Sequence, residues 1–128
     1  MNLPVETVDD IRERNAYGIL TGLTKIEAKK RFPCEVISVK SYKNTIAGAE
    51  NYGNFCIRVK NAITKIANEN NKVVAIISHG GLMRAIHREI LKLGEIDNIA
   101  DCAFMIIRVH DNNWELVETD GILKKSKS

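Results

Sequence analysis

The chain has few cysteines, and none of them form a closely spaced pair. Cys34, Cys56 and Cys102 are scattered over 128 residues. An odd, widely spaced set offers no disulfide framework and is typical of a reducing compartment. The N-terminal residues also lack the long apolar core of a signal peptide. We therefore expect a cytoplasmic protein.

Long apolar runs and concentrated basic patches are also absent. No apolar stretch approaches the ~20 residues that a membrane-spanning helix needs, so we predict no membrane partner. The net charge is only +3, and the basic residues are spread out except in the C-terminal tail. Such a balance suits an anionic small molecule and does not indicate nucleic acid. We predict no nucleic-acid partner.

What the chain does contain is enough apolar sequence for one domain with a core. We place this domain at residues 1–120 and a flexible basic tail at residues 121–128. Thr24 and Glu27 have the spacing of a capping box, which predicts a short helix that ends at about Phe32, before Pro33. Residues 34–49 show little periodicity and are predicted to form a surface loop, with a brief extended piece at 36–39.

The second half of the chain alternates between helical and strand patterns. Apolar residues at three- and four-residue steps predict an amphipathic helix over residues 51–68. The continuous apolar run 73–78 is typical of a strand that is covered on both faces. A helix over 82–93 follows, with Gly94 as its C-cap. Residues 103–109 and 114–118 are predicted to pair as a hairpin around a turn at 111–113. This order indicates an α/β layered structure.

The sequence Ser78-His79-Gly80-Gly81 lies between the predicted strand and the helix that follows it. Open α/β sheets place their ligands at that edge. The backbone N–H groups of Gly80 and Gly81 at a new helix favour an anion such as phosphate. The His79 imidazole could donate a hydrogen bond or move a proton; alternatively, it simply caps a turn. We interpret His87 and His110 as surface residues.

Three segments, in order, resemble the histidine phosphatase superfamily, which includes the cofactor-dependent phosphoglycerate mutases. The first is Ile11-Arg12-Glu13-Arg14-Asn15-Ala16-Tyr17-Gly18, followed by Leu20-Thr21-Gly22-Leu23-Thr24. The second is Gly48-Ala49-Glu50-Asn51, with Arg58 further along. The third is Ser78-His79-Gly80-Gly81, which is similar to the family's second-histidine motif. The terminal hairpin with Trp114 also fits, so the resemblance covers nearly the whole chain.

The resemblance implies roles for particular residues. His79 corresponds to the second histidine of the phosphate pocket, and Glu13 occupies, or adjoins, the position of the general acid that protonates the leaving group. Gly80 and Gly81 would bind phosphate. The first two motifs also contain four candidates for the substrate pocket, namely Arg14, Tyr17, Glu50 and Asn51. For Glu50 a positional role at a helix mouth is the alternative. No metal and no organic cofactor is implied.

The family's nucleophile lies in an Arg-His-Gly sequence, and these 128 residues contain no such sequence. The chain therefore resembles only the C-terminal portion of a histidine phosphatase. We expect a partial phosphoglycerate mutase-like α/β fold, with helices on both faces of a layered sheet and a C-terminal β-hairpin. Because a strand without its neighbour leaves backbone groups unpaired, we expect a complementing N-terminal chain or self-association.

Three functions stay open at this stage. The chain is part of a phosphomonoester phosphatase that is inactive until the missing region is supplied, a pseudoenzyme that binds a phosphorylated small molecule, or a self-associating module. Between phosphatase and mutase, only about two dozen residues separate Lys25 from Glu50. That short span resembles the phosphatase branch, whereas the Leu-Thr-Gly-Leu-Thr-Lys sequence leans toward the mutases.

Overall fold

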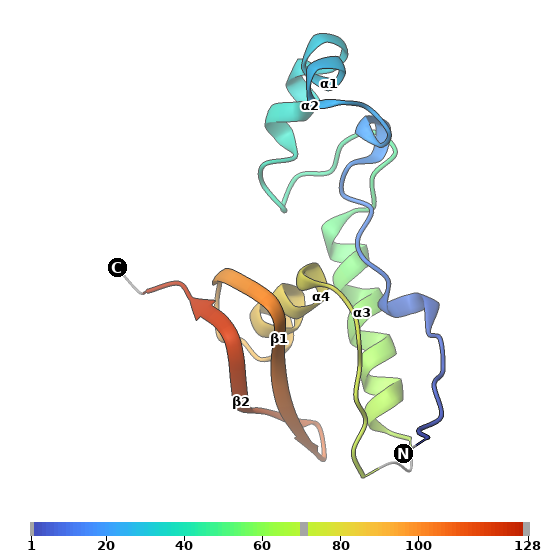
Figure 1. The fold of residues 1–128 in the computed structure, drawn as a ribbon, viewed down its shortest axis with the longest axis vertical. Helices are drawn as coiled ribbons and strands as arrows, with labels where there is room; N and C mark the ends of the chain where they lie inside the picture. The colour runs from blue at the N-terminus through green and yellow to red at the C-terminus, as the bar shows by residue number, and fades with distance from the viewer. Residues whose placement is uncertain (1, 70–71, 127–128) are drawn as a thin grey trace. The chain divides into compact units, whose positions relative to one another are not determined.

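The computed structural model describes residues 2–69 and 72–126, which form two compact units (Figure 1). One unit contains residues 14–57, and the other contains residues 1–13 together with residues 58–128. The helix α3 (Tyr52–Ala67) runs from the first unit into the second. Each unit is described below by itself.

The unit of residues 14–57 is built around two short helices. Thr24 caps α1 (Lys25–Arg31) through the predicted capping box, in which the Thr24 hydroxyl accepts from the Glu27 N–H and the Glu27 carboxylate accepts from the Thr24 N–H. Pro33 ends α1 as predicted but also begins α2 (Pro33–Ser38). The prediction of a loop over residues 34–49 was therefore wrong for residues 34–38, as was the extended piece at 36–39, whereas residues 39–49 form turns and loop as predicted. Proline has no N–H to lose at a first helical position, so it can begin a helix as readily as it ends one.

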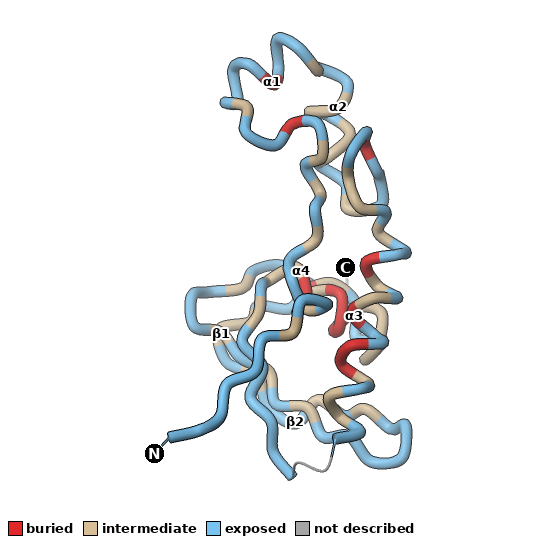
Figure 2. Tube along the Cα trace, turned by 90° about the vertical axis from the view of Figure 1, so that its right-hand side faces the viewer, coloured by how far each residue is buried: buried red, intermediate tan, exposed pale blue. Residues whose placement is uncertain are grey.

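Helix α3 confirms the amphipathic pattern that predicted it. Four apolar side chains on one face are buried, namely those of Phe55, Val59, Ala62 and Ile63. Figure 2 shows buried stretches recurring along this helix between exposed ones. The burial of this face, rather than intrinsic propensity, stabilises the helix.

The helix predicted over residues 82–93 begins earlier and changes its winding. Helix α4 (Gly80–Ala85) is followed directly by one π-helical turn, Ile86–Ile90. Left-handed backbone at Lys92 (φ 56°) and at Gly94 (φ 84°) then reverses the chain. The helical segment ends earlier, with Leu91 as its C-cap and Lys92 as the first left-handed residue, so the prediction of Gly94 as the C-cap was wrong.

The C-terminal hairpin is longer than predicted. Strand β1 (Ile96–His110) pairs antiparallel with β2 (Asn113–Lys124). The two turn residues, Asp111 and Asn112, both have positive φ, which suits the twist of a tight hairpin. A register shift between Ile99 and Phe104 interrupts the ladder. Strand β2 continues four residues into the segment that the sequence assigned to a tail.

Residues 73–78 do not form the predicted strand. A strand exists only where another segment accepts and donates its backbone hydrogen bonds, and in the part of the chain that the structure describes the only sheet pairs β1 with β2. The run is not covered on both faces either, because Val73 is 90% exposed and Ile77 is 94% exposed.

Helices followed by an antiparallel C-terminal hairpin agree with the partial α/β fold that was expected. Among the described residues, no helix has the length and apolar character to cross a membrane.

Candidate functional site

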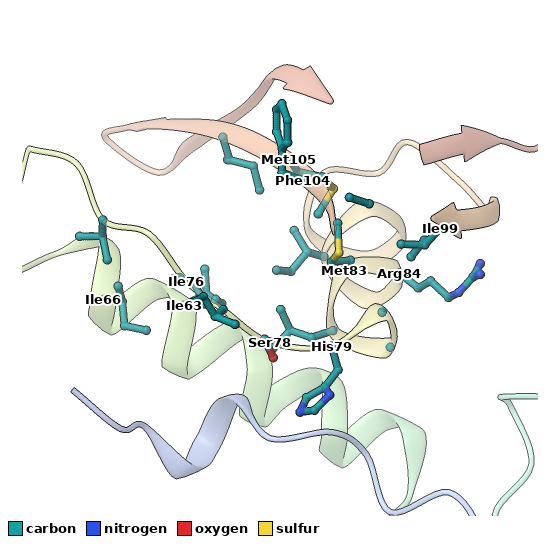
Figure 3. A pocket seen from close by; sticks show the side chains of 18 of the residues that line it. Ile63, Ile66, Ile76, Ser78, His79, Met83, Arg84, Ile99, Phe104 and Met105 are labelled. Carbon is teal, nitrogen blue, oxygen red and sulfur yellow. The ribbon is translucent and has the colours of Figure 1, made fainter. Parts of the chain in front are cut away.

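His79 is the N-cap residue of α4, in extended backbone geometry (φ −125°, ψ 160°). Its carbonyl oxygen accepts from the Met83 N–H at 3.2 Å. The imidazole makes no capping hydrogen bond, so the turn does not use the ring. Figure 3 shows the exposed ring on the opposite side of the extended segment from Phe104 and Met105. The backbone therefore fixes the position of His79 while its side chain stays available.

Glu13, which is far from His79 in sequence, lies against the start of α4. A Cβ atom at Gly81 would come within 2.9 Å of the Glu13 carboxyl carbon and closer still to its Oε1. Only a residue without a side chain leaves room for the carboxylate at this position. The same construction at Gly80 meets nothing nearer than the Ile99 Cδ1 at 3.7 Å, an ordinary contact. The structure thus brings together the predicted acid, the predicted histidine and the two glycines.

Two side chains that the sequence analysis did not interpret hold the segment before Glu13. Arg58, on α3, donates from one guanidinium nitrogen to the carbonyl oxygens of Asp10 (2.7 Å) and Arg12 (3.1 Å). Ser78 donates from its hydroxyl to the Ile11 carbonyl oxygen at 2.7 Å. These are long-range contacts between a loop and two other elements, and no local spacing in the sequence signals them.

A hollow of about 990 Å³ adjoins this site within the same unit. Its polar lining includes Glu13, Ser78 and His79. Most of the remaining lining is apolar and comes from α3, residues 74–77 and β1, including Ile63, Ile66, Ile76, Ile99, Phe104 and Met105, which Figure 3 labels. The Arg84 guanidinium, also at this hollow, donates to the Ile96 carbonyl oxygen.

The four substrate-pocket candidates belong to the unit of residues 14–57. Arg14 donates to the carbonyl oxygens of Glu50 (3.0 Å), Tyr42 (2.8 Å) and Asn44 (3.1 Å), so it organises the loop around it. The Glu50 N–H donates to the Asn15 carbonyl oxygen at 2.7 Å.

The two remaining candidates differ in how their side chains are used. Asn51 lies immediately before α3, and its Oδ1 accepts from the Asn54 N–H at 3.2 Å. The Tyr17 side chain is exposed. Asn51 thus acts as a capping residue, and the Tyr17 ring is open to solvent. A role in substrate binding remains a prediction for both.

The prediction that His87 is a surface residue was wrong. His87 is completely buried, and its Nδ1 lies 2.7 Å from the Gly94 carbonyl oxygen. The π-helical turn that contains it rotates the following residues relative to a regular helix, which sequence spacing cannot anticipate. His110, by contrast, is exposed at the hairpin turn as predicted. Within residues 2–69 and 72–126, no three His, Cys, Asp or Glu side chains gather into a metal site.

Comparison with known proteins places these observations in a family. The profile of the histidine phosphatase superfamily (branch 1) matches residues 1–120. A metal-independent phosphoserine phosphatase from Arabidopsis thaliana is 25% identical over 111 residues, which cover 84% of this chain and 46% of that protein. The chain thus spans about half the length of this curated relative. No solved structure matches the chain significantly. Since the family match covers nearly all of the sequence, including the His79 and Glu13 segments, the chain belongs to the histidine phosphatase superfamily.

Proposed function

We propose that the chain carries the His79 and Glu13 half of a phosphomonoester phosphatase pocket. The contact between the Glu13 carboxylate and Gly81, two residues after His79, carries this proposal. In it, the His79 imidazole hydrogen-bonds the phosphoryl oxygens, and the N–H groups of Gly80 and Gly81 neutralise part of their charge. Glu13 protonates the departing alkoxide, which is a poor leaving group until it gains a proton.

Turnover needs a further group in this proposal. Phosphoryl transfer depends on a positioned nucleophile and on charge neutralisation. The three histidines of these 128 residues are His79, His87 and His110, and none lies in an Arg-His-Gly sequence. Burial keeps His87 from acting as a nucleophile. We therefore expect the chain alone to bind a phosphomonoester and to hydrolyse it only when a segment with Arg-His-Gly is supplied.

The name of the plant relative suggests O-phospho-L-serine as the first substrate to test. The cytoplasmic location that we propose is supported by the three thiols, none of which is in a disulfide. The phosphatase branch is preferred to the mutase branch because the chain between Lys25 and Glu50 is short and forms only α1, α2 and their connections.

Ligand-dependent unfolding tests the binding half of this proposal. Phosphate or O-phospho-L-serine at 100 times its Kd should stabilise the chain by about 2.7 kcal/mol. His79→Ala should abolish the stabilisation, whereas His110→Ala, which removes an exposed imidazole elsewhere, should retain it. Binding that is equal in all three proteins, or absent from all three, would contradict the proposal.

A hydrolysis assay tests the catalytic half. The chain is mixed with a separately made segment of a related phosphatase that contains Arg-His-Gly, and release of phosphate from O-phospho-L-serine is measured. We expect no turnover by the chain alone and His79-dependent turnover in the mixture. Binding without turnover, even in a stable mixture, would instead identify a module that only binds phosphorylated ligands.

A further inference from the structure

The loop that carries Glu13 has little structure of its own. Between residues 2 and 13 the only regular element is the three-residue 3-10 turn Asp9–Ile11, and most of these residues are exposed. Locally, Arg12 bonds back to Asp9 through an exposed ion pair at 2.9 Å, and such pairs contribute little to stability. A general acid must nevertheless stay within hydrogen-bond reach of the atom that it protonates. Contacts from other elements to the backbone of this loop therefore matter for the position of Glu13.

Arg58 and Ser78 supply that support. Together they donate to three consecutive carbonyl oxygens, those of residues 10, 11 and 12, directly before Glu13. Arg58 projects from α3, and Ser78 immediately precedes His79. The bonds from Arg58 are charge-assisted, and bonds of this kind are roughly twice as strong as neutral ones. The loop is thus fixed from two directions, by α3 and by the segment that bears the histidine.

We infer that Arg58 and Ser78 are positioning residues, which hold the Glu13 loop so that the carboxylate rests over Gly81 beside His79. This inference rests on the proposed function for the role of Glu13, but the geometry that it describes can be tested separately. Ser78 links the two halves of the site most directly. Because its hydroxyl binds the loop while its own backbone leads into His79, any shift of one group is transmitted to the other.

Nuclear magnetic resonance of the full chain tests the geometry. A nuclear Overhauser contact between the Glu13 side chain and the Gly81 Hα should be present in the wild type. It should weaken in Ser78→Ala and in Arg58→Met, and be lost when both substitutions are combined. Arg58→Lys should restore part of it, because a lysine retains one charged donor. Lys60→Met, on the exposed side of the same helix, is the matched control and should leave the contact unchanged.

The affinity for phosphate tests the functional consequence. The Glu13 carboxylate over Gly81 repels the anion, so Glu13→Gln should raise the affinity. Glu13→Gln should no longer raise it in the Arg58→Met or Ser78→Ala background, where the carboxylate is no longer held over Gly81. Gly81→Ala, whose Cβ displaces the carboxylate, should also remove this effect, whereas Lys60→Met should keep it.

The outcomes separate the two proposals. A folded double variant that keeps the contact between Glu13 and Gly81 would overturn the inference. So would loss of that contact while Glu13→Gln keeps its full effect on the affinity for phosphate. If phosphate does not bind the wild type at all, the proposed function fails, and the Overhauser contact alone still decides whether Arg58 and Ser78 hold the loop. Should Arg58→Met fail to fold, Ser78→Ala carries both measurements.

Discussion

At the scale of single residues, the three histidines differ in burial, and their sequence context alone did not predict this difference. His79 is exposed at a helix N-cap, His87 is completely buried, and His110 is exposed at a hairpin turn. The buried ring is anchored by its Nδ1 to the Gly94 carbonyl oxygen, while its Nε2 has no hydrogen-bond partner among the described residues. His87 therefore stabilises the turn between α4 and β1 rather than taking part in chemistry.

This role predicts a large difference between two alanine substitutions. His87→Ala should lower the free energy of unfolding by about 2–4 kcal/mol, since it removes a buried hydrogen bond and leaves a cavity. His110→Ala should change it by less than about 0.5 kcal/mol, as surface substitutions usually do. Denaturant unfolding of the three proteins measures both values. Similar values for the two variants would show that His87 is not buried in solution.

Sequence could predict the position of a site residue only where the neighbouring residues form a recognisable pattern. His79, Gly80 and Gly81 follow an apolar run and precede a helical pattern, and that context placed them at a turn. Glu13 was connected to them only by the resemblance to a family, because its loop has no periodicity. Arg58 and Ser78 act across long sequence separations, and nothing local to either residue indicates its hydrogen-bond partner.

At the scale of elements, sequence predicts features that depend on neighbouring residues better than features that depend on pairing with a distant segment. The capping box at α1 is local, so Thr24 and Glu27 predict it by themselves, and the structure confirms it. Residues 73–78 could form a strand only by pairing with another segment, and an apolar pattern in the sequence does not show whether such a segment is present. Helix α2 was missed because six residues are too few to show a period.

The capping box at α1 also has a pH dependence with a definite sign. Hydrogen bonds from the Thr24 backbone and side chain hold the pKa of Glu27 below its usual value. A carboxyl group whose pKa is lowered on folding contributes stability above its unfolded pKa of about 4.5 and loses it as the pH falls through the folded value. Acid should therefore weaken the cap.

Thr24→Ala should destabilise the chain by about 1 kcal/mol at neutral pH, the usual cost of losing an N-cap. The difference from wild type should shrink as the pH falls through the lowered pKa of Glu27. Thr45→Ala, in a loop, is a matched control that should show neither effect. Amide exchange in α1 as a function of pH reports the change. A pH-independent difference would mean that the Glu27 carboxylate does not take part in the cap.

At the scale of the whole molecule, the chain carries motifs of a family whose curated relative is about twice as long. The unpaired segment 73–78 exposes apolar side chains next to backbone groups that no described strand satisfies. Exposed apolar edges of this kind favour pairing with another chain. We propose that in the absence of a complementing segment the chain associates with itself through this run.

Sedimentation velocity over a range of concentrations tests that proposal. Burying one isoleucine side chain is worth about 1.5–3 kcal/mol, and each 1.4 kcal/mol is a factor of about ten in Kd. Ile77→Lys should therefore weaken self-association at least about tenfold. Ile37→Lys, an exposed isoleucine on α2, should leave it unchanged.

A wild-type chain that stays monomeric at high concentration would exclude self-association, and equal effects of the two substitutions would place it elsewhere than in residues 73–78. A segment that completes the phosphatase pocket by pairing with this edge should also compete with self-association, so the same measurement links assembly to the catalytic proposal.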